Sequence, residues 1–562
     1  MRPGATDFGL WCSATALHRS YRVGHRAVYV LRLKIILPDK ASFEHTALNR
    51  ITFGARQEDV QLVQGMGWRA WAEDQLSPPT GDEAEVANHL SKRTMRIMYA
   101  YQGPAGDSPG WPGIDERRPL NYLNADVQSL WEMVSKTEIT IAPNERKRIQ
   151  EELSAATWIR NTHATFQVRE FMADFWNNHF NVGRQDDIYG SAALPTFDRS
   201  VIRSRVFGNF RDLLEAVATS TAMLRYLDNA ASTAEHPNEN YARELLELHT
   251  MGIQAYLGVR PNQFDKSPDG FTDDDIVQAS RAFSGWTVAQ GQQGPQGPLP
   301  FSGAFFYNPL QHNDLADQFM GIDLSKIKGS MAQGRAILDI AASHPSTADF
   351  VCVKLCRRIF GDDPPPRVID RAKAAWMTHL TAPDQIGQVL RAILLDGTEI
   401  GQSPSKLRRP YERVIALLRT TNTEVNAYNG AFDAVSTLGD GLFAWPTPEG
   451  RPDHDAHWYS TAAHLETWDL MLHVLSHASF RTTLTKQTPK DITTSPEALV
   501  DYWVDRLVGY RLRPEGMQAL IDDINGPIGL TAAFASGGIM NMESALRRFM
   551  AIIAASPEFA MR

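Results

Sequence analysis

Apolar residues recur at helical spacing along most of this chain, whereas the alternating pattern of β-strands is scarce. Between residues 41 and 75 this spacing is punctuated by Gly54, Gly65 and Gly67, which divide it into two or three short helices. Longer helical stretches are predicted over residues 144–182, 196–228, 331–398 and 406–425. The pattern therefore predicts a mainly α, large multi-helix globular protein.

Segments rich in proline, glycine and aromatic residues interrupt the helical pattern. Residues 102–119 and 440–458 are predicted to be loops for this reason. The clearest interruption is 286–312, because the glycines and prolines between Gly291 and Pro300 cannot continue a helix. Aromatic residues follow them, so a short β-hairpin or an ordered aromatic loop is predicted there.

These interruptions suggest how the chain is organised. Residues 1–40 are predicted to be a basic N-terminal extension with little order, and residues 41–290 a helical half that carries the main motifs. A connecting loop is predicted over 291–330 and a second helical half over 331–562.

Composition places the chain among ordinary globular proteins. Of its 562 residues, 43% are apolar and 22% are charged, so it can bury a large core without metals or disulfides. The net charge of −9 lacks the basic excess of a general nucleic-acid binder. No uninterrupted apolar run reaches about 18 residues, so no transmembrane segment is predicted.

The first 40 residues match a secretory signal poorly. Their apolar run, residues 28–37, is broken by Arg32 and Lys34, whereas a signal peptide needs an uninterrupted apolar region. The segment is either a translated extension upstream of the true start or a disordered basic arm.

One predicted helix carries two of the three cysteines and three basic residues. Cys352 and Cys356 are four residues apart and share a face, and two buried apolar side chains are favoured over half of a metal site. Lys354, Arg357 and Arg358 complement the negative end of the helix dipole, and an anion site is the sharper alternative.

His179 follows an apolar helix face. At about 100° per residue, this face contains Val168, Phe171, Met172, Phe175 and Trp176. A histidine in such an arc is more often a hydrogen-bonded core residue. The functional alternative is a catalytic or metal-binding imidazole on the floor of a site, with Asn177, Asn178 and Asn181 near its mouth.

A second segment places two carboxylates on one helix face. Asn240, Arg243, Glu244 and Glu247 form a polar arc, whereas His249 lies on the opposite, apolar side. Two carboxylates on one face suit a divalent cation or an acid/base pair. An ordinary solvated face with Arg243 as counter-ion is the alternative interpretation.

Residues 265–275 resemble the start of a calcium-binding loop, with oxygen ligands at the expected spacing and Gly270 after them. However, Ile276 occupies the position where that loop needs a glutamate. A turn followed by a helix that Thr272 caps, with Asp275 in the third helical position, explains the segment equally well.

The segment from Ser280 to Trp286 leads into an aromatic loop that contains His312. Arg281 and Trp286 have the side chains to bind an anionic or sugar-like ligand, because aromatic rings stack on sugars. Alternatively, Gly285 ends a helix here and Trp286 packs against it.

Several well-known motifs do not occur in the sequence. It has no P-loop, dinucleotide-binding glycine turn, nucleophile elbow, HExxH or CxxC motif. These absences argue against P-loop nucleotide hydrolases, Rossmann dehydrogenases, α/β-hydrolases and zincins. No nucleotide or flavin cofactor is therefore expected.

Seven stretches of the sequence resemble, in their residues and their order along the chain, motifs of a bacterial family called domain of unknown function 1800. These are Leu48–Gly54, Phe171–Val182, Met223–Asn229, Pro237–Gly252, Ala279–Val288, His344–Arg358 and Leu442–Pro448. The resemblance implies a mostly helical protein, commonly exported and often encoded beside a sulfatase/phosphatase-like partner. It implies no agreed reaction. The chain departs from the family pattern in lacking a clear export signal and in the segment from His312 to Asp323.

The first functional hypothesis is a hydrolase that acts on a polymeric, carbohydrate-containing substrate. Glu244 and Glu247 would be acid/base groups or metal ligands, and His179 a base or ligand. Substrate would be bound by Asn178, Asn240, Arg243, Arg281, Trp286 and His312. A divalent cation is the cofactor under consideration, and no metal-ligand set is assigned.

The second hypothesis is a non-catalytic extracytoplasmic binding or assembly factor that works with a sulfatase/phosphatase-like partner protein. The motifs would then belong to the core and to an interface. The family resemblance implies a periplasmic or secreted protein, and without a clear signal peptide a cytoplasmic location stays open.

Overall fold

The computed structural model describes residues 22–23, 26–27, 41–106, 108–135, 141–183, 187–259, 269–402, 406–426, 435–476, 480–493, 495–526, 529–530 and 539–562. Of these, 22–23, 26–27, 461–463 and 539–541 are described by their backbone alone. The predicted extension 1–40 therefore lies outside the described residues, apart from the paired strands β1 (Arg22–Val23) and β2 (Arg26–Ala27).

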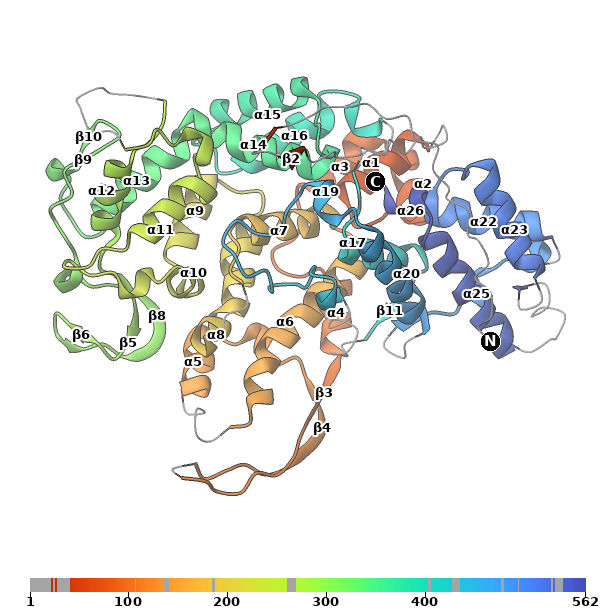
Figure 1. Ribbon diagram of the computed structural model, residues 1–562, viewed down its shortest axis with the longest axis horizontal. Helices are drawn as coiled ribbons and strands as arrows, with labels where there is room; N and C mark the ends of the chain where they lie inside the picture. Colours follow the sequence, from red (N-terminus) through yellow and green to blue (C-terminus); the bar gives the residue numbers. More distant parts are fainter. Residues whose placement is uncertain are drawn as a thin grey trace.

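Helices dominate the described chain, which confirms the predicted mainly α class (Figure 1). The first part forms α1 (Phe43–Ile51), α2 (Gln57–Met66), α3 (Trp68–Gln75), α4 (Ala84–Ser91), β3 (Thr94–Tyr99), β4 (Ile114–Pro119), η1 (Tyr122–Asn124), α5 (Val127–Ser135), α6 (Pro143–His163), α7 (Gln167–His179) and α8 (Ile188–Thr196). The helices over 41–75 are separated at Gly54 and Gly67, as their spacing predicts.

The middle of the chain alternates helices with short strands. It forms η2 (Phe197–Ile202), η3 (Arg203–Arg205), α9 (Phe210–Ala218), α10 (Thr221–Tyr226), η4 (Asn229–Ala231), α11 (Glu239–Glu244), η5 (Leu245–His249), η6 (Ile253–Ala255), α12 (Asp273–Phe283), β5 (Trp286–Gln290), β6 (Gln293–Gly294), β7 (Gly297–Pro298), β8 (Phe301–Tyr307), η7 (Pro309–Gln311), β9 (Gln318–Phe319), β10 (Ile322–Asp323), η8 (Leu324–Lys326), α13 (Ala332–Ser343), α14 (Pro345–Phe360), α15 (Pro366–Thr378) and α16 (Gln385–Leu395).

The last part is again helical. It forms η9 (Glu399–Gly401), α17 (Pro410–Thr420), β11 (Glu424–Val425), α19 (Asp455–Trp458), α20 (Thr461–Ser476), β12 (Phe480–Arg481), α21 (Leu484–Gln487), η10 (Lys490–Ile492), α22 (Pro496–Val508), α23 (Pro514–Asn525), α25 (Ile539–Ala554) and α26 (Pro557–Ala560).

Local chemistry explains many of these helix boundaries. Asn238 begins α11 because its side-chain oxygen accepts a hydrogen bond from the Tyr241 amide, at 3.0 Å. Thr272 and Asp275 form the predicted capping box at the start of α12. The earlier part of the calcium-loop alternative, 265–268, lies outside the described residues.

Helix α7 lies at the centre of the molecule. Every residue of α7 except Asn177 is buried, and its apolar side chains belong to one hydrophobic core that extends from Ala47 to Phe559. In Figure 1 this helix lies between the lobe formed by α9–α13 and the helices α20–α25. The core therefore joins both predicted halves of the chain.

The predicted helix over 144–182 is wrong at one point, because α6 and α7 are separate. Ala164 adopts an extended backbone, and the Gln167 side chain donates hydrogen bonds to the carbonyls of Asn161 (3.2 Å) and Ala164 (2.9 Å). Those carbonyls therefore find a side-chain donor where the helical hydrogen bonds end.

The predicted loop over 102–119 is also wrong in its second half. Residues 114–119 form β4, which pairs with β3 from Thr94 opposite Pro119 to Tyr99 opposite Ile114. The strand was missed because it is rich in charged residues, such as Asp115, which binds Arg96 diagonally across the pair at 2.7 Å. Figure 1 shows this hairpin projecting from the helical body.

The prediction for 286–312 is confirmed. Strand β5 pairs antiparallel with β8, with an irregularity between Val288 and Gln290, and β6 pairs with β7. Cys352 and Cys356 are buried free thiols, as expected for apolar packing residues.

Candidate functional site

A buried carboxylate on α7, Asp174, is bound by arginines from three distant segments. Its Oδ2 accepts hydrogen bonds from Arg358 at 2.9 Å and Arg409 at 2.8 Å, and its Oδ1 accepts one from Arg451 at 2.8 Å. Burial alone would raise the pKa of Asp174, but the three positive charges outweigh it and hold that pKa well below the ordinary value. Asp174 is thus permanently charged at neutral pH.

The same arginines bind two further buried carboxylates. Glu412 accepts hydrogen bonds from the Arg358 guanidinium and from the Arg409 backbone amide, the latter at 2.9 Å. Asp440 accepts from Arg451 at 3.3 Å and from the Tyr411 amide at 2.9 Å. Because each charge has partners from other segments, this network joins α7, α14 and α17 to the loop that follows Asp440.

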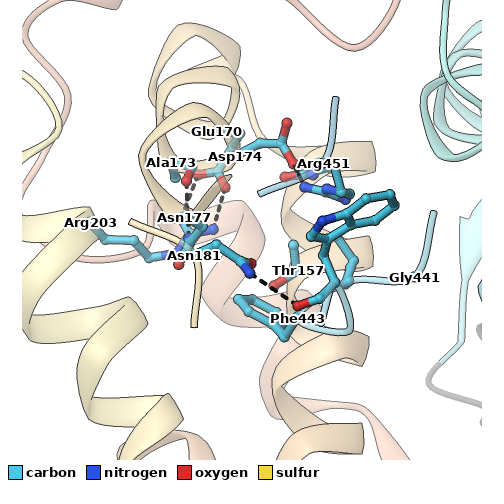
Figure 2. Close-up of a pocket in the computed structure, with 13 residues that line it drawn as sticks. Thr157, Glu170, Ala173, Asp174, Asn177, Asn181, Arg203, Gly441, Phe443 and Arg451 are labelled. Carbon is cyan, nitrogen blue, oxygen red and sulfur yellow. Dashed lines mark hydrogen bonds and ion pairs between the residues drawn. The ribbon is translucent and has the colours of Figure 1, made fainter. Parts of the chain in front are cut away.

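A small pocket lies beside this network, between α6, α7 and residues 441–451, here called the 441–451 loop (Figure 2). Its empty volume is about 420 Å³, part of it open to solvent. Glu170 in its wall is bound by Arg169 at 3.1 Å and by Arg203 at 2.7 Å. The acidic residues of the pocket, Glu170 and Asp174, therefore have their oxygens occupied by arginines and are poorly suited to acid/base chemistry.

Two asparagines at the end of α7 hold the 441–451 loop in place. The Asn178 side chain donates to the Arg451 carbonyl at 3.0 Å and accepts from the Arg451 amide at 2.7 Å. Asn181 donates to the carbonyls of Trp445 (3.0 Å) and Thr447 (2.8 Å). The sequence predicts both side chains near the mouth of a site. In the structure they bind the backbone of this loop and position it.

That loop brings a third carboxylate, Glu449, towards Glu244 and Glu247. Glu244 is half-buried and makes no hydrogen bond or ion pair with any part of the chain that the structure describes. Burial raises the pKa of Glu244, and the negative charges of Glu247 and Glu449 raise it further, while Arg243 opposes them. Glu244 is therefore the carboxylate at this junction best suited to carry a proton.

The neighbours of Glu244 are positioned by specific contacts. Glu247 accepts a hydrogen bond from Arg243 at 3.1 Å, and Arg243 also donates to Asp273 at 3.1 Å. The Tyr226 hydroxyl donates to the Pro446 carbonyl at 3.0 Å, which ties α10 to the 441–451 loop. Burial raises the pKa of Tyr226 to about 12, and the charges of Glu449 and Glu244 add to this effect.

Glu247 lies in η5, which is a π-helical turn that follows α11 directly. The Thr250 hydroxyl donates to the Leu245 carbonyl at 2.7 Å and stabilises the end of this turn. A π-helical turn widens the helix and redirects the side chains after it, and such turns are frequent at functional sites. A regular helical wheel cannot represent this change.

His179 lies beneath the surface and does not touch the carboxylates. Its Nε2 is 3.1 Å from the His249 carbonyl, and its Nδ1 is 3.4 Å from Lys354 Nζ. Burial is the main cause that lowers its pKa well below the ordinary value, and Lys354 and His249 add to this. The η5 turn carries both His249 and Glu247, so His179 lies behind the carboxylate group as a neutral imidazole.

The remaining predicted binding residues are dispersed. Asn240 is exposed, Arg281 donates to Gln278 and to the Leu315 carbonyl, and His312 Nδ1 lies 3.0 Å from the Ser284 carbonyl. In the described chain, no hydrogen bond, ion pair or ring contact joins Arg281 or His312 to Glu244.

Trp286 is fully buried, at 0% exposure, so the prediction that it forms a stacking platform for a ligand is wrong. Its ring packs against Phe283 and Phe305. The alternative, a tryptophan that packs at the end of a helix, agrees with these contacts.

The residues that sequence reasoning missed are Asp174, Tyr226 and Glu449. A signal existed for Asp174, since a charged residue on a helix that is otherwise apolar needs a buried partner. Glu449 gave no such signal, because a glutamate in a proline-rich loop is ordinary and its approach to Glu244 depends on the folded chain.

The group of residues whose potential metal-ligand atoms lie closest together does not suit a metal ion. Among the described residues, one group of three has donor atoms within 4.8 Å of one another, and it consists of His89, His163 and Glu424. The two imidazole rings are stacked at 4.1 Å with only 10° between their planes, so one ion cannot lie in both ring planes. Arg93 Nη2 also lies 3.1 Å from His89 Nδ1, where its charge opposes a cation.

Comparison with known proteins identifies a family across nearly the whole chain. A family model described as "Protein of unknown function (DUF1800)" matches residues 46–561. Neither the curated proteins nor the solved structures contain a match. Within the described residues, none of the helices combines the length and the apolar character that a membrane crossing requires.

Proposed function

Because this chain belongs to the DUF1800 family, whose description gives no reaction, we propose from its geometry that it is a hydrolase. Its acid/base carboxylates would act where α11, η5 and the 441–451 loop meet, on a polymeric, carbohydrate-containing substrate. The observation that carries this proposal is the environment of Glu244, a half-buried carboxylate that lacks a described partner and has a raised pKa.

The proposed roles follow from the contrast between neighbouring carboxylates. Glu244 holds a proton more readily than an ordinary glutamate, and this suits a general acid that protonates the leaving oxygen. Glu247, which Arg243 holds at 3.1 Å, and Glu449 are the candidates for the general base that activates water. Pairs of carboxylates whose environments push their pKa values apart are the usual basis of glycoside hydrolysis.

Aromatic and hydroxyl groups in the 441–451 loop support a carbohydrate substrate. Trp445 in the 441–451 loop is half-buried, whereas Trp286 is fully buried. We assign to Trp445 the stacking role that was predicted for Trp286. The exposed Thr447 hydroxyl and the exposed Glu449 carboxylate add hydrogen-bonding groups to the same loop.

Glycan hydrolysis by the Glu244→Gln variant tests this proposal. The purified protein is assayed against a panel of glycans, with and without a chelator. Glu244→Gln is expected to lose about 10²- to 10⁴-fold in rate, because an amide cannot donate the proton. Its melting temperature should match that of the wild type, since Glu244 forms no ion pair with the residues that the structure describes.

Glu239→Gln is the matched control, because Glu239 is exposed on the same helix. It should retain the wild-type rate. Equal rates for Glu244→Gln and the wild type would contradict the proposal. Loss of wild-type activity in the chelator would instead assign the carboxylates to a divalent cation.

A second candidate function is the binding or assembly factor, and the β3–β4 hairpin favours it. The hairpin projects from the body (Figure 1) and exposes Met98 at 56% and Tyr101 at 71%. Exposed apolar side chains on a projecting element are typical of protein contacts. Replacing both with serine should abolish binding to a sulfatase/phosphatase-like partner and leave hydrolysis intact if both functions exist.

A further inference from the structure

Lys354 on α14 is a half-buried residue whose amine lies beside an imidazole and an aromatic ring. Its Nζ lies 3.4 Å from His179 Nδ1 and 5.8 Å from the centre of the Phe350 ring. No carboxylate oxygen of the described residues lies within 4.0 Å of it. By contrast, the buried Lys406 is paired with Asp455 at 2.9 Å, which is how a structural lysine is normally stabilised.

The contacts of His179 fix which of its nitrogens faces the lysine. Its Nε2 lies 3.1 Å from the His249 carbonyl, and a carbonyl accepts but cannot donate. The proton of the neutral imidazole is therefore on Nε2, and the lone pair of Nδ1 points to Lys354 Nζ. This lone pair can accept a hydrogen bond from the amine. However, a neutral imidazole has no negative charge that would stabilise the protonated form of the lysine.

Charged groups from α14 itself and from the chain that follows α17 act on the amine. Burial lowers the pKa of Lys354 to about 8; Asp453 and Glu449, from the chain that follows α17, oppose this, and Arg357 on its own helix adds to it. His179 and His249 are both neutral, with pKa values lowered by burial. With a pKa of about 8, roughly a tenth of Lys354 is an uncharged, nucleophilic amine at pH 7, far more than of an ordinary lysine.

We propose that Lys354 Nζ is a nucleophile that forms an imine with a small aldehyde or ketone. This goes beyond the hydrolase proposal and does not rest on it. A second feature of the same cluster points to a ligand: His249 is 1% exposed, and its Nε2 is buried without a hydrogen-bond partner. Such an unused polar atom is costly unless a bound group satisfies it.

The step balances without another reactant. The Nζ lone pair attacks the carbonyl carbon, and the π electrons of the carbonyl move to its oxygen, which takes a proton to give a carbinolamine. The nitrogen loses two protons: the first forms the hydroxyl of the carbinolamine, and the second leaves with this hydroxyl as water. A carbon–nitrogen double bond then replaces the carbon–oxygen double bond. No oxidation or reduction occurs in this step, and water is the sole by-product.

Reductive trapping of the full-length protein with limiting propanal and cyanoborohydride tests the proposal. Peptide mass mapping then gives the labelling rate of each lysine. Lys326 is the internal reference, because it is 82% exposed and paired with Asp323 at 2.6 Å. At pH 7, Lys354 should be labelled at least about tenfold faster than Lys326, since a larger share of it is neutral. Its rate should be half-maximal near pH 8 and level off about one pH unit higher.

Labelling of Lys354 that is absent, or no faster than that of Lys326, would overturn the proposal. The wild-type measurement decides this even if a variant folds poorly. Lys354→Arg should lose the fast label, because its charged guanidinium forms no imine under these conditions. Lys326→Arg should keep it. Fast labelling of Lys354 that survives in urea-unfolded protein would also contradict the proposal, because the folded cluster would then not be its cause.

Discussion

Two carboxylates of this protein, Asp174 and Glu244, show how strongly a neighbourhood determines what a residue can do. Asp174 is enclosed by three guanidinium groups, which hold its pKa well below the ordinary value. Glu244 has no described partner, and burial together with two like charges raises its pKa. The first is suited to holding segments together, and the second to carrying a proton.

Replacing Asp174 by asparagine should destabilise the protein by about 3–5 kcal/mol, because it leaves three buried arginines without their shared negative partner. The free energy of unfolding, measured in urea, checks this. Asp339→Asn is the control, since Asp339 pairs with Arg211 but is 66% exposed. That change should cost less than about 1 kcal/mol. Similar losses in the two variants would argue against a central role for Asp174.

At the scale of elements, the position of the 441–451 loop determines which side chains meet at the candidate site. It carries Glu449 and Trp445, and the side chains of Asn178 and Asn181 bind its backbone. Close contact with α7 leaves no room for a larger residue at one point of the loop. A Cβ atom on Gly450 would lie 2.2 Å from the Asn178 carbonyl oxygen, and the φ of Gly450 is +76°.

Gly450→Ala should therefore displace the loop. Gly439→Ala is the matched control, because Gly439 has nearly the same φ, +77°, but an added Cβ there meets nothing within 4 Å. Both variants carry similar backbone strain, so their difference isolates the clash, which we expect to cost about 1–3 kcal/mol more in Gly450→Ala. Faster hydrogen exchange over 441–451 in Gly450→Ala alone would report the displacement. Equal exchange in both variants would show that the loop is held in some other way.

At the scale of the whole molecule, burial of histidines makes stability depend on pH. Burial is the main cause that lowers the pKa of His45 to about 4, and of His163 and His249 to about 3. In the unfolded chain these groups take up protons below about pH 6.5. Their contribution to stability is therefore complete above about pH 6.5 and is lost as the pH falls towards 4.

The unfolding free energy should consequently decrease from about pH 6.5 downwards, by up to about 1.4 kcal/mol per pH unit for each histidine. Urea denaturation at several pH values between 7.5 and 4.5 measures this slope. His45→Asn should reduce the slope by as much as one proton, because His45 then no longer takes up a proton on unfolding. A stability that is constant between pH 7 and pH 5 would show that these imidazoles are not held neutral.

The sequence by itself determined the features that depend on near neighbours in the chain. Helical spacing and capping residues predict most helices, including the capped start of α12. The Gly/Pro run and the aromatic residues after it predict a short hairpin or an ordered aromatic loop, of which β5 and β8 form the hairpin. The apolar arc of α7 also predicts the burial of His179. The helices and caps follow from interactions between residues three or four positions apart, and the hairpin from a turn between strands that are close in the chain.

Only the tertiary structure decided which distant groups meet. The arginines that bind Asp174 are 184, 235 and 277 residues away from it in the chain, and a single sequence gives no sign of such pairings. The same holds for the approach of Glu449 to Glu244, of Lys354 to His179, and for the burial of Trp286. Their chemistry depends on desolvation and on charges a few ångströms away, and both exist only once the core has assembled.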